Sequence, residues 1–147
     1  MRAGALVRGF PPGLRLIMRV TIKKDVFYEM LFHCLQAGPM EAYGYLAGPG
    51  EAIEVMYKMQ SFQDESSLPD PSEAFRLRRE IKERGHKLLG IFRAHARTDQ
   101  PTQTDVDSFP DPDVVLFIVA LSENGMPTVK AYAVQAGNST KITIDIE

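Results

Sequence analysis

Residues 90–105 read "GIFRAHARTDQPTQTD", and this stretch indicates both the kind of fold and the kind of site. Its apolar half is typical of a strand, in which alternate side chains point to the same face. Arg93 and His95 are therefore expected to project together. The strand opens into a polar loop, where Thr102 can cap a short helix and hold Asp105 near the strand end. A histidine and a carboxylate that converge in this way are typical metal ligands.

Upstream of this stretch, the sequence predicts a strand, a helix and a hairpin. Residues 18–22 are short and rich in β-branched side chains, which predicts the strand. From Lys24, apolar residues recur at helical spacing until Gly38, where the helix is expected to end. Residues 42–48 and 52–59 flank a Pro-Gly turn, so a hairpin is the simplest interpretation.

A second helix is predicted before the quoted stretch, and three strands are predicted after it. Ser72 is a fair N-cap for this helix, and Leu77 and Ile81 lie on one face of it. The first strand after the loop is apolar throughout, which is typical of a central strand covered on both faces. The three strands are expected at residues 114–121, 128–134 and 141–146. Two helices and about seven strands predict an α/β, or α+β-like, domain in which helices flank a mixed β-sheet.

Composition narrows the classes of function. The 147 residues suit one domain, which we expect at residues 18–147, with residues 1–17 as a flexible N-terminal extension. We find no apolar run long enough for a bilayer and no signal peptide, so we expect a soluble, cytoplasmic protein without membrane partners. A net charge of -2 with scattered basic residues argues against nucleic-acid binding. The only cysteine, Cys34, fits a reducing compartment and reads as a small buried hydrophobe.

Two segments together resemble a known superfamily. "GPMEAYGYLAGPG" (residues 38–50) and the quoted stretch are similar to the Mov34/MPN/PAD-1 superfamily in its metal-dependent JAMM (JAB) branch. Bacterial members have a Pro-x-Glu segment followed by Gly-x-Leu-x-Gly, then a strand ending His-Ser/Thr-His and a Pro-Ser-x-x-Asp loop. The similarity spans residues 18–147 and includes "DPSEAFRLRREIKERG" (residues 70–85). It implies a JAMM/MPN fold with a cytidine-deaminase-like architecture.

The resemblance also implies residue roles. Glu41 matches the family's general acid/base, which activates a zinc-bound water. His95 and Asp105 match two of its three protein ligands to zinc, and Thr102 takes the place of the serine that stabilises the oxyanion. Arg93 stands where the family has its first histidine ligand.

Arg93 conflicts with a catalytic zinc site. Such a site uses three protein ligands and leaves a fourth position for water. A guanidinium stays protonated and has no lone pair to donate, so only two ligands remain. The six residues between His95 and Thr102 are also one fewer than the family spacing. We hypothesise that the Arg93 guanidinium occupies the place of the zinc and pairs with Glu41 and Asp105.

Two functions from different classes remain open. The first is a zinc-dependent isopeptidase or peptidase that cleaves after the C-terminal glycine of a ubiquitin-like or sulfur-carrier protein. The second is a metal-free module that binds another protein. Taken singly, Glu41 is also explained as a turn residue, His95 as a structural histidine and Asp105 as a helix-terminus charge. His86 or Asp99 is a further candidate for the missing ligand.

Overall fold

Eight strands of the chain form one mixed sheet in the computed structural model, which describes residues 4–5, 16–38, 42–59, 62–63, 68–96, 98–107, 109, 111–121 and 126–147. The strands of this sheet are β3 (Arg19–Ile22), β4 (Tyr43–Gly48), β5 (Ala52–Ile53), β6 (Val55–Lys58), β9 (Lys87–His95), β10 (Val115–Ala120), β11 (Thr128–Gln135) and β12 (Asn138–Ile146). The helices are α1 (Lys24–Ala37), α2 (Pro71–Glu83) and α3 (Gln103–Asp107). Two smaller pairs join β1 (Gly4–Ala5) with β2 (Leu16–Ile17) and β7 (Phe62–Gln63) with β8 (Leu68–Pro69).

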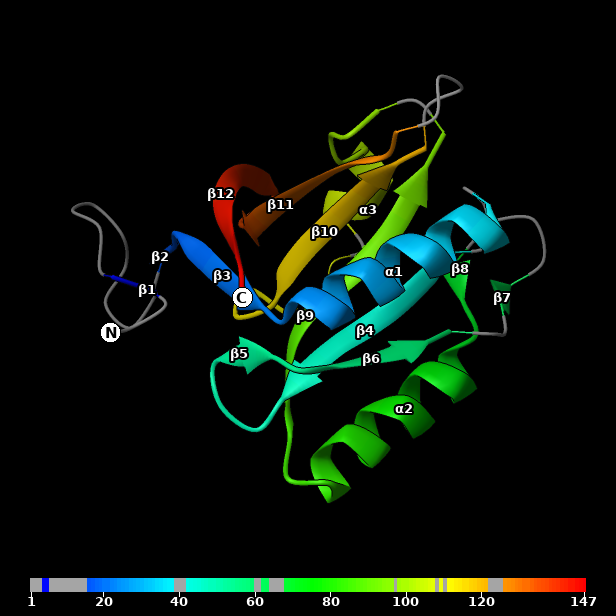
Figure 1. Cartoon of the computed structure of the whole chain (residues 1–147), viewed down its shortest axis with the longest axis vertical. Coiled ribbons are helices and arrows are strands. Elements are labelled where there is room, and N and C mark those ends of the chain that lie inside the picture. Colours follow the sequence, from blue (N-terminus) through cyan, green and yellow to red (C-terminus); the bar gives the residue numbers. More distant parts are fainter. Residues whose placement is uncertain are drawn as a thin grey trace.

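The large sheet has the order β5-β3-β12-β11-β10-β9-β4-β6 and nearly closes on itself (Figure 1). β5 pairs with β3 at one edge, β6 pairs with β4 at the other, and only Glu54 separates β5 from β6. The Glu54 N–H donates to the Ala47 carbonyl at 2.9 Å, which ties this bridging segment to β4. The predicted hairpin is confirmed as β4 and β6, although its second strand is broken at Glu54.

In the interior of the sheet, β9 and β10 are parallel neighbours. All six residues of β10 are buried, which confirms the predicted central strand. Two parallel neighbours require a crossover connection. Here the crossover carries α3, which therefore lies beside the end of β9 (Figure 1).

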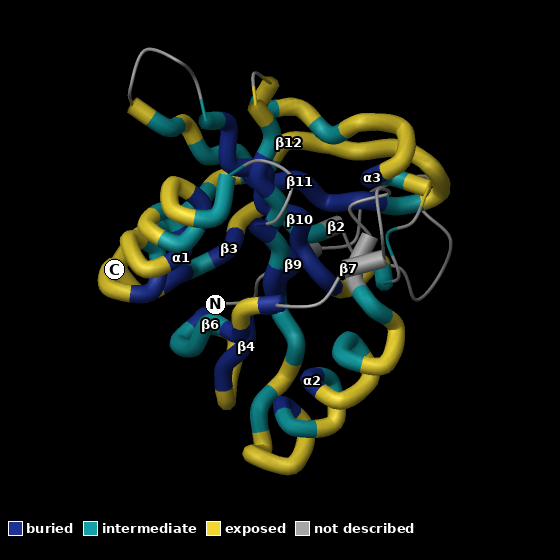
Figure 2. The backbone as a smooth tube through the Cα atoms, turned by 90° about the vertical axis from the view of Figure 1, so that its right-hand side faces the viewer, coloured by how far each residue is buried: buried dark blue, intermediate teal, exposed yellow. Residues whose placement is uncertain are grey.

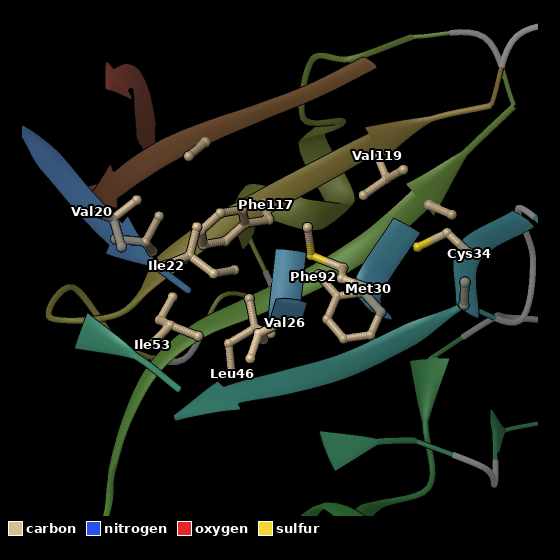
Figure 3. Packing of buried hydrophobic residues seen from close by; sticks show 14 residues of the cluster. Val20, Ile22, Val26, Met30, Cys34, Leu46, Ile53, Phe92, Phe117 and Val119 are labelled. Atoms are coloured by element: carbon tan, nitrogen blue, oxygen red, sulfur yellow. The ribbon is translucent and has the colours of Figure 1, made fainter. Parts of the chain in front are cut away.

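Helix α1 covers one face of the sheet, as its apolar spacing predicts. Val26, Met30 and Cys34 are buried and pack in one cluster with Phe92 and Phe117 (Figure 3). Burial raises the pKa of the Cys34 thiol to about 12, so this cysteine stays protonated at neutral pH. The interpretation of Cys34 as a small buried hydrophobe is thus confirmed.

Helix α2 covers the opposite face, with Leu77 and Ile81 buried as predicted and its outer side exposed (Figure 2). The predicted N-cap, Ser72, is wrong. The cap is Asp70, whose side chain accepts a hydrogen bond from the Ser72 N–H at 2.8 Å. The helix begins at Pro71 because proline fits the first helical position, where no backbone donor is needed.

The proposed boundary at residue 18 stays a prediction. Within the expected extension, the described residues Gly4–Ala5 and Leu16–Ile17 pair with each other. None of the helices in the described ranges is both long enough and apolar enough to cross a membrane.

Candidate functional site

Arg93, His95 and Asp105 meet at the carboxyl end of β9, on the side of the sheet that α2 and α3 cover. Arg93 and His95 alternate along the strand with Phe92 and Ala94, which pack in the cluster against α1. Among the described residues, Asp105 is the only buried charged one. The strand alternation predicted from the sequence therefore places a cation and an imidazole beside a buried carboxylate.

The two oxygens of the Asp105 carboxylate differ in their partners: Oδ2 is hydrogen-bonded, whereas buried Oδ1 has an ion-pair contact but no hydrogen bond among the described residues. Oδ2 accepts from the Thr102 N–H at 2.8 Å and lies 2.8 Å from His95 Nε2. Oδ1 lies 3.3 Å from Arg93 Nη1. Thr102 Oγ1 in turn accepts from the Asp105 N–H at 3.1 Å, so these two residues cap each other at the start of α3. The side chain of Thr102 thus positions Asp105, in addition to any role at an oxyanion.

The ionisation of Asp105 decides which atom carries the proton in this cluster. Burial alone raises the pKa of Asp105, but the hydrogen bonds from His95 and Thr102 and the nearby positive charge of Arg93 outweigh it. The pKa is therefore held below its ordinary value, and the carboxyl group is ionised at neutral pH. An ionised carboxylate only accepts hydrogen bonds, so His95 Nε2 must carry the proton and donate it.

Arg93 is held between this carboxylate and an aromatic ring. Its guanidinium carbon lies 5.4 Å from the centroid of the Tyr43 ring, within the range of a cation–π contact. Its side chain is only 13% exposed. Burial, and then the neighbouring Tyr45, raises the pKa of Tyr43 to about 12, although Arg93 opposes this shift. Tyr43 is consequently a neutral phenol against the cation.

The loop between His95 and Thr102 is fastened to β11 at Asp99. The Tyr132 hydroxyl donates to the Asp99 carbonyl at 2.6 Å, and Lys130 Nζ lies 3.1 Å from Asp99 Oδ2. The Asp99 carboxylate is therefore paired with Lys130. It is not part of the cluster around Asp105, and the candidate role of Asp99 as a ligand lacks support.

His86 is also far from the site. It precedes β9, whereas His95 ends this strand of nine residues. At about 3.3 Å per residue, the two histidines are roughly 30 Å apart. His86 cannot share a metal ion with His95 at that distance.

Glu41, the predicted general acid/base, lies outside the described residues. The next residue, Ala42, is buried, and its carbonyl accepts from the Ala94 N–H at 3.1 Å. The chain directly after Glu41 therefore pairs with β9 between Arg93 and His95. The role of Glu41 stays a prediction.

The described donors do not fit a catalytic zinc ion. Zinc in such a site needs three protein ligands, and the cluster offers His95 and Asp105. In place of a third ligand stands Arg93, whose guanidinium Nη1 lies 3.3 Å from the Asp105 carboxylate. Across the ranges that the structure describes, no group of three or more His, Cys, Asp and Glu residues could hold a metal ion.

The sequence analysis did not identify Tyr43 as a residue of the site. It also did not predict the contacts that Tyr132 and Lys130 of β11 make with Asp99. Tyr43 contacts Arg93 because β4 pairs with β9 in the register Tyr43↔Arg93. Tyr132 and Lys130 reach Asp99 from a strand more than 30 residues further along the chain. The sequence "AYGYLAG" predicts a strand, but it does not predict the pairing of this strand with β9, which places Tyr43 at the site.

The nearly closed mixed sheet flanked by helices matches the fold of JAB/MPN domain structures. Residues 23–134 match the family of prokaryotic homologues of the JAB domain. The chain therefore belongs to this family, which confirms the resemblance found in the sequence. No curated protein shows significant similarity to it.

Solved structures agree with this fold. A protein from Desulfitobacterium hafniense, determined in solution, is 27% identical with a TM-score of 0.73, and the match covers 87% of this chain and 92% of the other. A JAB1/MPN domain protein from Archaeoglobus fulgidus is 19% identical with a TM-score of 0.56, covering 86% and 97%. A JAMM structure described as a metalloprotease-like zinc site in the proteasome and signalosome is 16% identical with a TM-score of 0.53, covering 85% and 96%. The last two similarities concern the fold alone.

Proposed function

We propose that this chain is a metal-free member of the JAB/MPN family that binds another protein and does not hydrolyse peptide or isopeptide bonds through zinc. The observation that carries the proposal is the ion pair between Arg93 and Asp105. Their side chains are 13% and 1% exposed, so the pair is largely shielded from water. It stands where the resemblance places a histidine and an aspartate as ligands of one zinc ion.

The electrostatic repulsion between Arg93 and a zinc ion at this place would be large, which supports the proposal. At an effective dielectric constant of about 20, a guanidinium and a dication roughly 4 Å apart repel by about 8 kcal/mol. Structural zinc sites with complete ligand sets gain about 10–16 kcal/mol from the metal. Two ligands and an adjacent cation would leave little of that gain. Zinc would have to displace Arg93 from both Asp105 and the Tyr43 ring.

An exposed apolar stripe on α1 supports the binding role. Tyr28, Phe32 and Leu35 are 57%, 61% and 53% exposed and follow the spacing i, i+4, i+7 along one helix face. The fold itself needs the opposite face of this helix, which is buried. Large apolar side chains gathered on a surface are typical of protein-binding regions.

The second candidate is the zinc-dependent isopeptidase that the family resemblance implies, acting after the C-terminal glycine of a ubiquitin-like or sulfur-carrier protein. The observation in its favour is that His95 and Asp105 do converge, with Thr102 beside them. For that activity, the Arg93 side chain would have to move away from Asp105 and Tyr43 so that zinc can bind. Glu41 would then act as the general base.

Hydrolysis of a diglycine-linked fusion of a ubiquitin-like protein separates the two candidates. We expect no cleavage by the purified chain, with zinc added or with a chelator present. Affinity capture should return a partner whose retention is unchanged by chelator and by His95→Ala. Zinc-stimulated cleavage that Glu41→Gln abolishes would overturn the metal-free proposal.

A further inference from the structure

The expectation that basic residues are scattered is wrong for one region, because positive charge is concentrated on and around α2. Residues 71–87 contain six basic and three acidic residues, whereas the rest of the chain contains 11 basic and 16 acidic residues. A chain with a net charge of -2 therefore presents one positively charged region against a negatively charged remainder. A charged region of this kind favours partners of opposite charge.

The outer side of α2 combines this charge with an exposed aromatic ring. Phe75, Arg79 and Lys82 follow the spacing i, i+4, i+7 and lie opposite the buried Leu77 and Ile81. Phe75 is 67% exposed and the Arg79 side chain 63% exposed. The Arg79 guanidinium carbon lies 5.8 Å from the Phe75 ring centroid, so cation and ring form one surface.

The acidic residues of α2 do not cancel this charge. Glu73 and Glu80 lie on the flank of the helix, where Arg76 is 3.6 Å from each of them. Glu80 is also 2.9 Å from Arg84. Glu83 approaches Arg79 only to 4.0 Å, and both side chains are more than 60% exposed. Such an exposed pair is weak and leaves Arg79 open to a stronger competitor.

Arg78 extends the positive charge of α2 toward Tyr45, a buried residue of β4. The Arg78 guanidinium carbon lies 5.3 Å from the Tyr45 ring centroid. The rings of Tyr45 and Tyr43 are 6.4 Å apart, and Arg93 lies over Tyr43. We call Phe75, Arg78, Arg79 and Lys82 the basic track. The basic track lies on the face of the sheet that α2 covers, and α1 covers the opposite face (Figure 2).

We propose that the basic track binds an acidic segment of a partner protein, with an apolar side chain of that segment against Phe75. This inference rests on the proposed protein-binding function and names the chemistry of the partner. Charge complementarity identifies the occupant here. For the stripe of α1, nothing in the structure shows what covers it.

A protein segment fits this track better than a nucleic acid does. Duplex DNA carries a negative charge about every 1.7 Å of its axis and would meet Glu73, Glu80 and Glu83 on the same helix. A peptide can place its carboxylates at selected positions and its apolar residue at Phe75.

The test is a fluorescence-anisotropy titration of the full chain with a labelled acidic peptide that contains leucine, in chelator and at about 0.15 M salt. We expect saturable binding, and none of similar strength for a peptide with glutamine and asparagine in place of the acids. Arg79→Glu combined with Lys82→Glu should weaken binding roughly tenfold. Phe75→Ser should weaken it as well, at unchanged charge.

The matched control is Lys24→Glu combined with Lys141→Glu, which changes the net charge equally at exposed positions away from α2. It should change the affinity less than threefold. An equal loss in both double variants, no preference for the acidic peptide, or tighter binding of a single-stranded oligonucleotide would each refute the basic track. Because chelator is present throughout, such a failure is distinct from the zinc-dependent cleavage that would refute the proposed function.

Discussion

The two faces of β9 are built from alternate residues of one strand, yet they serve different purposes. Phe92 and Ala94 point into an apolar cluster against α1, whereas Arg93 and His95 point toward α2 and α3 and meet Asp105. The apolar face holds the fold together. The polar face carries a partly shielded charge cluster whose residue types are not explained by packing of the core, so its residues are where function is expected.

The largest loss of stability is expected from a substitution on the apolar face of β9. Phe92 is fully buried, and Phe92→Ala should lower the free energy of unfolding by about 3–5 kcal/mol because it leaves a cavity. Phe75→Ala, at an exposed phenylalanine, should change it by less than about 0.5 kcal/mol. Urea denaturation followed by circular dichroism measures both. Similar values for the two variants would mean that β9 is not the centre of the core.

The second-largest loss of stability is expected from a substitution in the cluster of Arg93, His95 and Asp105. Asp105→Asn removes the charge that compensates Arg93 and should cost about 3 kcal/mol of unfolding free energy. This is the lower end for buried pairs, since Arg93 keeps some contact with solvent. Asp107→Asn is the control, because Asp107 is an exposed aspartate of the same helix. If both variants had wild-type stability, the Arg93–Asp105 pair would contribute nothing to the fold.

The difference between wild type and Asp105→Asn should also depend on pH. The pKa of Asp105 is lower in the folded chain than its ordinary value, so its ionised form stabilises the fold. That contribution is complete above about pH 4 and is lost as the pH falls through the folded pKa. The gap between the two unfolding curves should therefore narrow below about pH 4. A gap that is constant down to pH 2 would show that the carboxylate charge is not what stabilises the cluster.

A smaller loss of stability is expected when the contact between β11 and the loop after β9 is removed. Tyr132→Phe removes the hydrogen bond to the Asp99 carbonyl and should cost about 1 kcal/mol. Amide exchange at Thr102, whose N–H donates to Asp105, should accelerate as the loop loosens. Tyr28→Phe, at an exposed tyrosine, should change neither quantity. Unchanged exchange at Thr102 in Tyr132→Phe would show that the loop holds its shape without β11.

Local patterns of the sequence were sufficient for much of this architecture. The helical spacing in α1 and the unbroken apolar run of β10 predict those elements because each pattern reflects burial of the element itself. The cap of α2 was misplaced because Ser72 and Asp70 are both good capping residues, and only the backbone at Pro71 decides between them. The break at Glu54 depends on the closure of the sheet, which no local pattern records.

In the site, too, some features follow from local sequence patterns and others depend on the pairing of distant strands. The convergence of Arg93 and His95 with Asp105 follows from strand alternation and a short loop, and the structure has this arrangement. The stack of Arg93 on Tyr43 depends on the register between β4 and β9. The roles of these residues in binding or catalysis remain predictions, because neither strand geometry nor family membership shows whether a guanidinium can replace a metal in function.

A calorimetric zinc titration of the unmodified chain and of Arg93→His tests most directly whether the guanidinium has taken the place of the metal. We predict no stoichiometric binding at submicromolar zinc for the unmodified chain. Arg93→His should gain zinc affinity, and His95→Ala in the same background should remove the gain. Stoichiometric, submicromolar binding by the unmodified chain would contradict the metal-free account.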